Sequence, residues 1–279
     1  MHRTGLILVT TAAVAWSTSG LFTRSLDLDA PTILFWRGVF GALGLLALLA
    51  ALPATGGPSS LRRLRGPGLA YAAVTAVSMV LFISALLTTS VARVAILTAT
   101  VPLVAGGLGW LLLGERPARS AVIASLAALA GVALMAGLGG DGTWGGDALA
   151  LLMAVCMGGM ILIARRHPGI PALAATCVAS GIGALAVLPF ATLGIGWGDI
   201  GLLALFALVN QVLGFGAFAI GARYLPPMET ALVTALDAPL APLWVWLVLA
   251  ETPSQATLAG GAVVMAAVLG HIVGGARGA

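Results

Sequence analysis

The residues of this sequence that could do chemistry are few, and two ionisable ones, Arg37 and Asp237, lie inside long apolar runs. Charged groups in an apolar environment are costly, so each is a candidate functional residue. Arg37 could bind a substrate carboxylate through paired hydrogen bonds, or it could extend to the membrane interface and pair with Asp27 or Asp29. Asp237 could bind an amine or carry a proton, or it could be a neutral group that caps a helix broken by Pro239.

Neutral polar and aromatic side chains in similar runs extend this set. Asn210 and Gln211 carry amides that can bind both ends of a zwitterion, although amides also join helices to one another. Hydroxyl groups usually bond back to carbonyls of their own helix, and aromatic rings often serve packing alone. The candidate substrate-binding residues are Trp16, Ser17, Arg37, Ser78, Phe82, Thr98, Asn210, Gln211, Phe215, Thr234 and Asp237.

Motifs of cofactor and metal chemistry are missing from the sequence. It has no Walker A motif, no Gly-x-Ser-x-Gly, and no cluster of His, Cys and carboxylate residues at metal-ligand spacing. Cys156 and Cys177 lie in apolar runs and indicate buried thiols. His271 could relay protons or only pack in its helix, and His167 lies in a loop beside two arginines. We therefore expect no catalytic residue, no metal and no cofactor.

The elements that position these residues must lie in a membrane. Hydrophobic residues make up 60% of the 279 and charged residues 8%, and the mean hydropathy is +1.11, whereas soluble domains carry about 25% charged residues. A disordered chain would be more charged, and a β-barrel would alternate apolar and polar residues. The net charge of +4 comes from scattered arginines, so we expect membrane orientation and no nucleic-acid partner.

Apolar runs between charged and Gly/Pro-rich breaks predict ten transmembrane helices, because a span needs about 20 apolar residues. The fold class is therefore all-α. The predicted spans are roughly Gly5–Phe22, Pro31–Leu52, Gly68–Leu87, Val91–Leu113, Ala121–Leu138, Ala148–Ile163, Pro171–Leu193, Ile200–Ala222, Pro227–Leu249 and Leu258–Val273.

Arginines are divided unequally between the two sides of this arrangement. An even number of spans puts both termini on one side, and ten arginines fall on that side against two on the other, so the positive-inside rule places both termini in the cytoplasm. We expect a multi-pass protein of the bacterial inner membrane. The ten are Arg3, Arg62, Arg63, Arg65, Arg116, Arg119, Arg165, Arg166, Arg223 and Arg277, and the two are Arg24 and Arg93.

The sequence also contains an internal repeat. An offset of 136 residues aligns Thr98 with Thr234, and it aligns the tryptophan, glutamate and proline that close this fourth helix with their counterparts in the ninth. Residues 1–140 and 141–279 therefore form two copies of a five-helix unit. Because five is odd, the second copy enters the membrane from the opposite side. Two inverted repeats with a site at the midplane are a common plan of secondary transporters.

These motifs resemble those of the drug/metabolite transporter superfamily, specifically its EamA-type members. In each half an apolar run ends in an acid and a proline, as in Trp110–Pro117 and Trp246–Pro253. The arginine of Phe35-Trp36-Arg37-Gly38 and the segment Ala15-Trp16-Ser17 fit as well. The second half lacks a counterpart of Arg37. The layout is most similar to the YddG-like exporters of aromatic amino acids, and the resemblance implies a transporter rather than an enzyme.

We therefore expect a secondary transporter that exports small metabolites, such as aromatic or other neutral amino acids, by alternating access. A transporter of other metabolites or drugs is the alternative. A polytopic enzyme acting on lipid-linked substrates would require clustered His, Asp or Glu near one interface. The expected partners are a small-molecule substrate and the bilayer, and the expected state is a monomer. The sequence leaves the exact substrate, the direction and the coupling ion open.

The repeat also predicts where the substrate binds. Positions that correspond in the two halves should meet at one axis, so we expect a central cavity at the midplane. Its predicted lining is Trp16, Ser78, Phe82, Thr98, Asn210, Gln211, Phe215 and Thr234.

Overall fold

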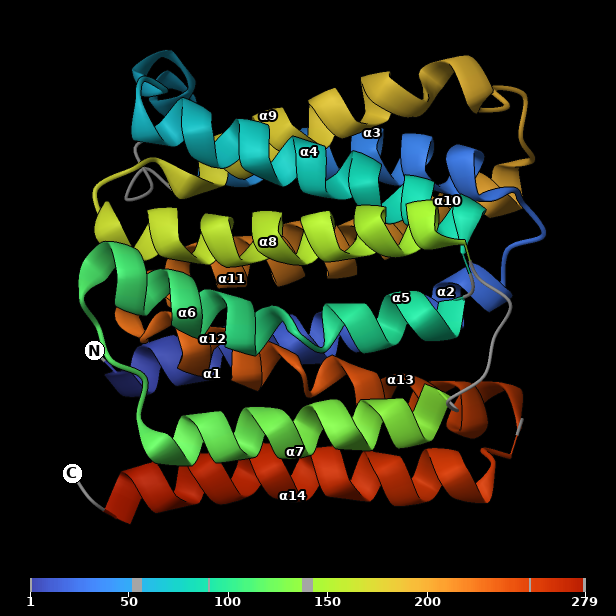
Figure 1. Cartoon of the computed structure of the whole chain (residues 1–279). Helices are drawn as coiled ribbons and strands as arrows, with labels where there is room; N and C mark the ends of the chain where they lie inside the picture. Colours follow the sequence, from blue (N-terminus) through green and yellow to red (C-terminus); the bar gives the residue numbers. More distant parts are fainter. Residues whose placement is uncertain (1, 52–56, 90, 137–142, 251, 278–279) are drawn as a thin grey trace.

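The computed structural model describes residues 2–51, 57–89, 91–136, 143–250 and 252–277, and the regular structure in these ranges is helical, without a strand. The helices lie side by side along one direction (Figure 1). Their bounds are α1 His2–Ser17, α2 Ser19–Arg24, α3 Ala30–Ala51, η2 Pro58–Arg63, α4 Pro67–Thr88, α5 Val91–Thr98, α6 Val101–Leu113, α7 Arg119–Ala136, α8 Trp144–Arg166, α9 Ala172–Val187, η3 Leu188–Phe190, α10 Trp197–Ala207, the π-helix η4 Leu208–Phe215, α11 Gly216–Gly221, η5 Ala222–Tyr224, α12 Pro227–Thr234, α13 Asp237–Leu249 and α14 Gln255–Arg277.

Within the described ranges, nine helical segments are long and apolar enough to cross a membrane. The apolar part of α4, Pro67–Phe82, is shorter than this criterion requires, although α4 itself continues to Thr88. Long apolar helices of a membrane protein are therefore confirmed, and the count of ten stays a prediction. The nine are His2–Arg24, Ala30–Ala51, Arg93–Leu113, Arg119–Ala136, Trp144–Arg166, Ala172–Phe190, Trp197–Tyr224, Pro227–Leu249 and Gln255–Gly274.

Three of the predicted continuous spans are each broken into two helices. Between α1 and α2, the hydroxyls of Ser17, Thr18 and Ser19 donate to carbonyls three residues earlier, each at 2.6 Å. Such bonds compete with the helical backbone pattern and end the helix. Prolines act in the other two breaks, because Pro102 and Pro239 have no N–H to offer the carbonyl four residues earlier.

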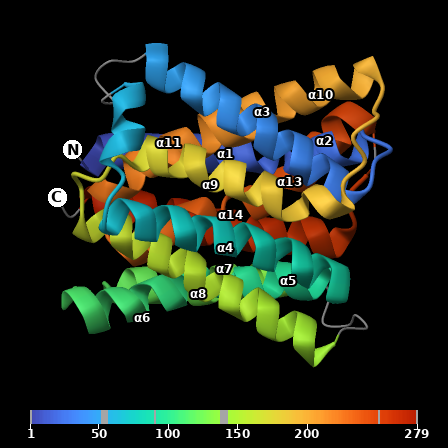
Figure 2. The same cartoon turned by 90° about the horizontal axis from the view of Figure 1, so that it is seen from above.

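The helices pack in pairs that mix the two halves of the sequence. α4 lies along α8, α3 along α9, and α7 along α14. Figure 1 shows α7 and α14 side by side at one edge of the bundle, and in the view from above in Figure 2 other helices pass in front of them. Small residues permit the closest approach. A Cβ at Gly131 would lie 2.7 Å from the carbonyl oxygen of Gly260, so only a residue without a side chain fits there.

The two ends of the bundle differ in composition and in packing. We call the end that holds the start of α1 and the end of α14 the termini end, and the other the opposite end (Figure 1). The chain path brings the ten arginines assigned to one side of the membrane to the termini end. Here α12 packs against α6, α7 and α8, whereas α5 and α13 make at most marginal contact at the opposite end.

The seam between α7 and α14 generates a testable prediction. In Gly260→Val the new Cβ would overlap the carbonyl oxygen of Gly131 and lie 2.8 Å from the backbone nitrogen of Met135. We expect a loss of about 1–3 kcal/mol of stability from overpacking, measured as a lower melting temperature of the detergent-solubilised protein. Gly270→Val on the same helix is the control, because nothing lies within 4 Å of its Cβ position. Equal melting temperatures for the two variants would contradict this seam.

Candidate functional site

A buried polar cluster joins α1, α2, α3 and the π-helix η4. The side-chain amide of Asn210 donates to Ser19 Oγ at 2.7 Å, and Asn210 Oδ1 accepts from Arg37 Nη1 at 3.4 Å. Trp16 Nε1 donates to the backbone carbonyl of Asn210 at 3.2 Å. The structure thus brings together three of the residues expected from the sequence, and adds Ser19, at the break between α1 and α2.

The guanidinium of Arg37 is only partly satisfied within this cluster. Its Cζ lies 5.4 Å from the ring centroid of Phe206, which fits a cation–π contact. Its Nε atom is buried and has no hydrogen-bond partner. Because a buried donor without a partner is unfavourable, Arg37 is ready to accept an anionic group. Neither Asp27 nor Asp29 is among the partners that the structure gives to Arg37.

Gln211 provides a second unsatisfied group, on the same π-helix that Arg37 contacts through Asn210. Its side chain is 1% exposed, and its Oε1 atom has no hydrogen-bond partner. Gly41 of α3 allows this position, because a Cβ on Gly41 would lie 2.8 Å from Cβ and Cγ of Gln211. A free carbonyl oxygen in this place suits an ammonium or hydroxyl donor. An unpaired donor and an unpaired acceptor therefore lie on adjoining helices.

Aromatic rings form a wall beside these polar groups. The Trp16 ring lies 4.8 Å from the Phe215 ring and 5.1 Å from the Phe218 ring, measured between centroids. Gly214 makes room for Trp16, because a Cβ there would lie 2.7 Å from Trp16 Nε1. Tilted contacts at these separations are favourable and fix the ring positions. The wall could accommodate an apolar substrate group.

The π-helix places Asn210, Gln211 and Phe215 in this site. Such helices close i→i+5 hydrogen bonds and are frequent at functional sites. Two further residues were not expected from the sequence: Phe206 against Arg37, and Trp244, whose Nε1 donates to Ser17 Oγ at 2.8 Å. Phe206 precedes Asn210 by four residues, so helical periodicity could have indicated a shared face. No comparable signal distinguishes Trp244.

Thr98, Thr234 and Asp237 lie at the helix breaks. The Thr98 hydroxyl donates to the carbonyl of Val94 at 2.8 Å, and the Thr234 hydroxyl donates to that of Ala231 at 2.7 Å. Asp237 is the first residue of α13, where the positive end of the helix dipole favours a carboxylate. Both threonine hydroxyls are thus bonded to their own helices, and a contact with substrate stays a prediction.

Ser78 and Phe82 belong to α4, which packs along α8 and α9 rather than along the π-helix. Phe82 is 37% exposed, and the aromatic contacts around Trp16 are made by Phe215 and Phe218. The predicted central cavity that includes Ser78 and Phe82 therefore stays a prediction. Among the described residues, no three His, Cys, Asp or Glu side chains could hold a metal ion.

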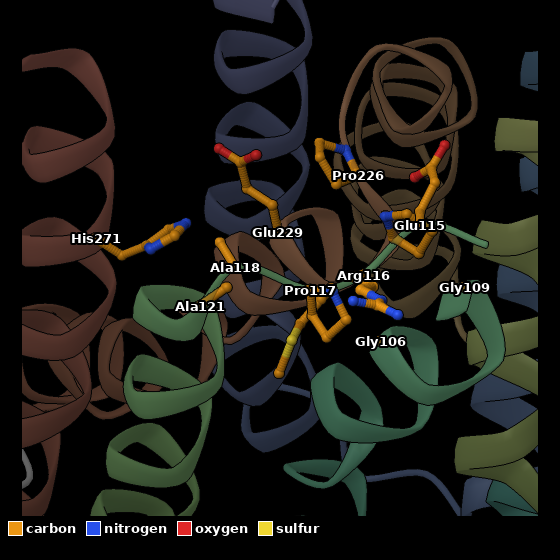
Figure 3. Close-up of a pocket in the computed structure, with 12 residues that line it drawn as sticks. Gly106, Gly109, Glu115, Arg116, Pro117, Ala118, Ala121, Pro226, Glu229 and His271 are labelled. Atoms are coloured by element: carbon orange, nitrogen blue, oxygen red, sulfur yellow. The ribbon is translucent and has the colours of Figure 1, made fainter. Parts of the chain in front are cut away.

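A cavity of about 190 Å³ lies at the termini end, away from the Arg37 cluster (Figure 3). Residues of α6, α7, α12 and α14 and of the segment after α6 line it. Its lining carries Glu115, Arg116, Glu229 and His271 among prolines, glycines and Met228. None of these residues was expected in a binding site.

The polar cluster generates a prediction of stability. Asn210→Leu would remove the acceptor for Arg37 Nη1 and the donor to Ser19, and we expect it to lower stability by about 1–3 kcal/mol. Adding Arg37→Met should recover part of that loss, because the uncompensated guanidinium is then absent. Melting temperatures of the wild type, both single variants and the double variant would form a double-mutant cycle. Additive effects would show that Arg37 and Asn210 are not coupled.

Comparisons with known proteins bear on the fold and the family. A solved crystal structure, titled only as a protein, matches 99% of this chain and 98% of its own with a TM-score of 0.81 and 22% identity. That similarity shows a shared fold. No curated protein sequence matches this chain. The model of the EamA-like transporter family matches residues 3–137 and, a second time, residues 144–273. The chain therefore belongs to the EamA-like transporter family, as a multi-pass membrane protein.

Proposed function

We propose that this protein exports small metabolites, first of all aromatic or other neutral amino acids, across the bacterial inner membrane by alternating access. The YddG-like subtype and the outward direction are part of the proposal and rest on sequence resemblance. Transport of other metabolites or drugs remains the alternative, because other members of such a family could share this layout. The site at Arg37 is the feature that distinguishes the two.

The observation that carries this proposal is the unsatisfied pair of buried groups, Arg37 Nε and Gln211 Oε1. A zwitterionic amino acid offers a carboxylate to a guanidinium and an ammonium to a carbonyl oxygen. Its side chain would contact the rings of Trp16 and Phe215. A substrate with this combination of charges satisfies both orphan atoms, whereas an uncharged drug satisfies neither through an ionic contact.

Alternating access requires two related halves, and two observations support them. The family model matches the chain twice, in residues 3–137 and 144–273. Helices of each half also pack on helices of the other half, as in an inverted repeat. α4 of the first half contacts α8 of the second, and α1 of the first half contacts η4 and α11 of the second. Discontinuous helices near the midplane, such as α1–α2 and α12–α13, accompany substrate sites in transporters of this design.

Unequal packing at the two ends supports a conformation closed at the termini end. There α12 packs against α6, and a Cβ on Gly106 would lie 2.8 Å from Met228 Sδ. The corresponding helices at the opposite end, α5 and α13, are at most in marginal contact among the described residues. With the termini in the cytoplasm, this state would admit substrate from the outer side.

The proposed orientation can be tested by cysteine labelling in intact cells. Cysteines at Ser120, in the first turn of α7, and Gly198, in the first turn of α10, would lie at exposed positions at the two ends. The reference protein carries Cys156→Ala and Cys177→Ala. A membrane-impermeant maleimide should label the cysteine at 198 before lysis and the cysteine at 120 only afterwards. Labelling of both before lysis, or the reverse order, would refute the proposed orientation.

The proposed substrate class can be tested in reconstituted vesicles. The protein should transport radiolabelled phenylalanine or another neutral amino acid, and Arg37→Met should reduce the rate at least about tenfold, because a charge-assisted pair stabilises by about 1.5–3 kcal/mol. Phenethylamine, which lacks the carboxylate, should be transported poorly by both. The exposed Arg24→Met serves as the control and should keep most of the activity.

The alternative gives a different pattern in the same assay. Vesicles that move drugs or nucleotide sugars but no amino acid would refute the proposed substrate class. Amino-acid transport at the wild-type rate in Arg37→Met would show instead that the arginine is structural, and the site would then have to be sought elsewhere.

A further inference from the structure

One of the three histidines in this protein, His2, contacts the carboxylate of Glu229, and a second, His271, lines the same cavity as Glu229. Glu229 lies in the first turn of α12, directly after Met228, which fills the notch at Gly106 and closes the termini end. The third histidine, His167, lies between α8 and α9 at the same end. Histidines beside a carboxylate are a combination that proteins use to sense protons.

His2 makes the first of these contacts. Its Nε2 atom lies 3.1 Å from Oε1 and 3.2 Å from Oε2 of Glu229, so the two oxygens share one nitrogen. The contact joins α1 of the first half to α12 of the second. His2 is 58% exposed and Glu229 15%, which gives protons from solvent direct access to the pair.

His271 approaches from the other side, across the cavity at the termini end. It comes from α14, and Figure 3 shows its ring and Glu229 on facing walls of that cavity. Its Nδ1 atom is buried and has no hydrogen-bond partner. A buried nitrogen without a partner is unfavourable, so a hydrogen bond from His271 to the carboxylate of Glu229 across the cavity would stabilise this end of the bundle.

The other charged or titratable groups around this site come from four parts of the chain. Glu115 of the segment after α6 is paired with Arg165 of α8 at 3.2 Å, and Arg116 lines the cavity. Arg3 is the neighbour of His2 on α1. From η5, Arg223 donates to the carbonyl of Pro168 at 2.8 Å, and Tyr224 packs near Gly5. The phenol of Tyr224 and the carboxylate of Glu115 are the further titratable groups in this set.

The opposite end has a related contact without histidine. The 136-residue offset aligns Glu229 with Arg93 and His271 with Met135. Arg93 forms a two-pronged pair with Asp147, which also accepts from Thr89 Oγ1 at 3.2 Å. Arginine keeps its charge at every physiological pH. The three histidines of the chain all lie at the termini end instead.

We propose that Glu229, His2 and His271 form a proton-binding site that holds the termini end closed. The inference rests on the alternating access of the proposed function. In the closed state, α12 packs on α6 and α7 and keeps Glu229 opposite His271. A proton from solvent binds an imidazole nitrogen and converts a neutral contact into a charge-assisted one. Opening withdraws α12 from α6 and α7 and separates Glu229 from His271, so the strengthened contact favours the closed state, whose population rises as the pH falls.

Spin-label distances test this proposal without any substrate. The full-length protein with Cys156→Ala and Cys177→Ala carries two labels per sample, placed at exposed positions. Labels at Ser120 and Gly169 span the termini end, and labels at Asp27 and Ala256 span the opposite end. Pulsed electron spin resonance in lipid nanodiscs at pH 8, 7 and 6 then gives the fraction of each distance.

We expect the short-distance fraction at the termini end to rise as the pH falls. Between pH 8 and pH 6 the ratio of closed to open should rise about three- to tenfold, the range for one or two partly exposed charge-assisted contacts. Glu229→Gln and the double variant His2→Gln/His271→Gln should lose the response. His167→Gln, a histidine at the same end that does not line the cavity, should retain it.

Four results would overturn the proposal. A pH response that persists in His2→Gln/His271→Gln would assign it to other groups, and loss of the response in His167→Gln would do the same. If each end shows two distances whose relative populations do not change with pH, alternating access is retained and the proton site is refuted. One distance at each end under every condition, in the presence and absence of transported substrate, would refute alternating access and the proton site together.

Discussion

Every peptide N–H and C=O inside a bilayer needs a partner from the protein itself, because no water is available there. Helices meet this requirement along their length, but each helix break exposes groups that must be satisfied locally. In this protein three consecutive hydroxyls, from Ser17 to Ser19, bond to carbonyls at the break between α1 and α2. Thr98 and Thr234 do the same before the other two breaks. The hydroxyl side chains at the helix breaks thus serve the backbone first.

The polar atoms that can bind a ligand are those that have no hydrogen bond to the backbone or to another side chain. Arg37 Nε and Gln211 Oε1 are in that set, and their position depends on glycine. Gly41 brings α3 against Gln211, and Gly214 brings the π-helix against Trp16. Close helix packing and substrate chemistry are therefore linked, because the same small residues that permit tight contact also position the unsatisfied groups.

The sequence predicted the architecture better than the site. Composition and apolar run length were sufficient for long membrane helices, and the short motifs around Arg37 and Glu115 were sufficient for the family, which the family model confirms. The breaks at Ser17–Ser19 and before Pro102 were not predicted, because a serine, threonine or proline in an apolar run is compatible with a continuous helix, whereas a break at Pro239 was one of the two interpretations of Asp237. Hydroxyls such as Thr98 also could not be separated from ligand contacts, since their bonding depends on backbone geometry.

Long-range contacts explain the remaining gap. Nothing in the sequence indicates that Trp244 would reach Ser17, or that His2 and Glu229, 227 residues apart, would meet. The 136-residue offset pairs position 229 with Arg93. It does not show that both positions bind the first helix of the other half, because that requires the helix packing itself.

The π-helix has a consequence for how two related halves come to differ. A turn that closes i→i+5 holds one residue more than an α-helical turn, so a single inserted codon can create it and a single deletion can remove it. Removing one residue from an α-helical register rotates everything on one side of the deletion by about 100°. Asn210 would then turn away from Arg37. The insertion of a single residue is thus enough to give one copy of a duplicated unit a binding face that the other copy lacks.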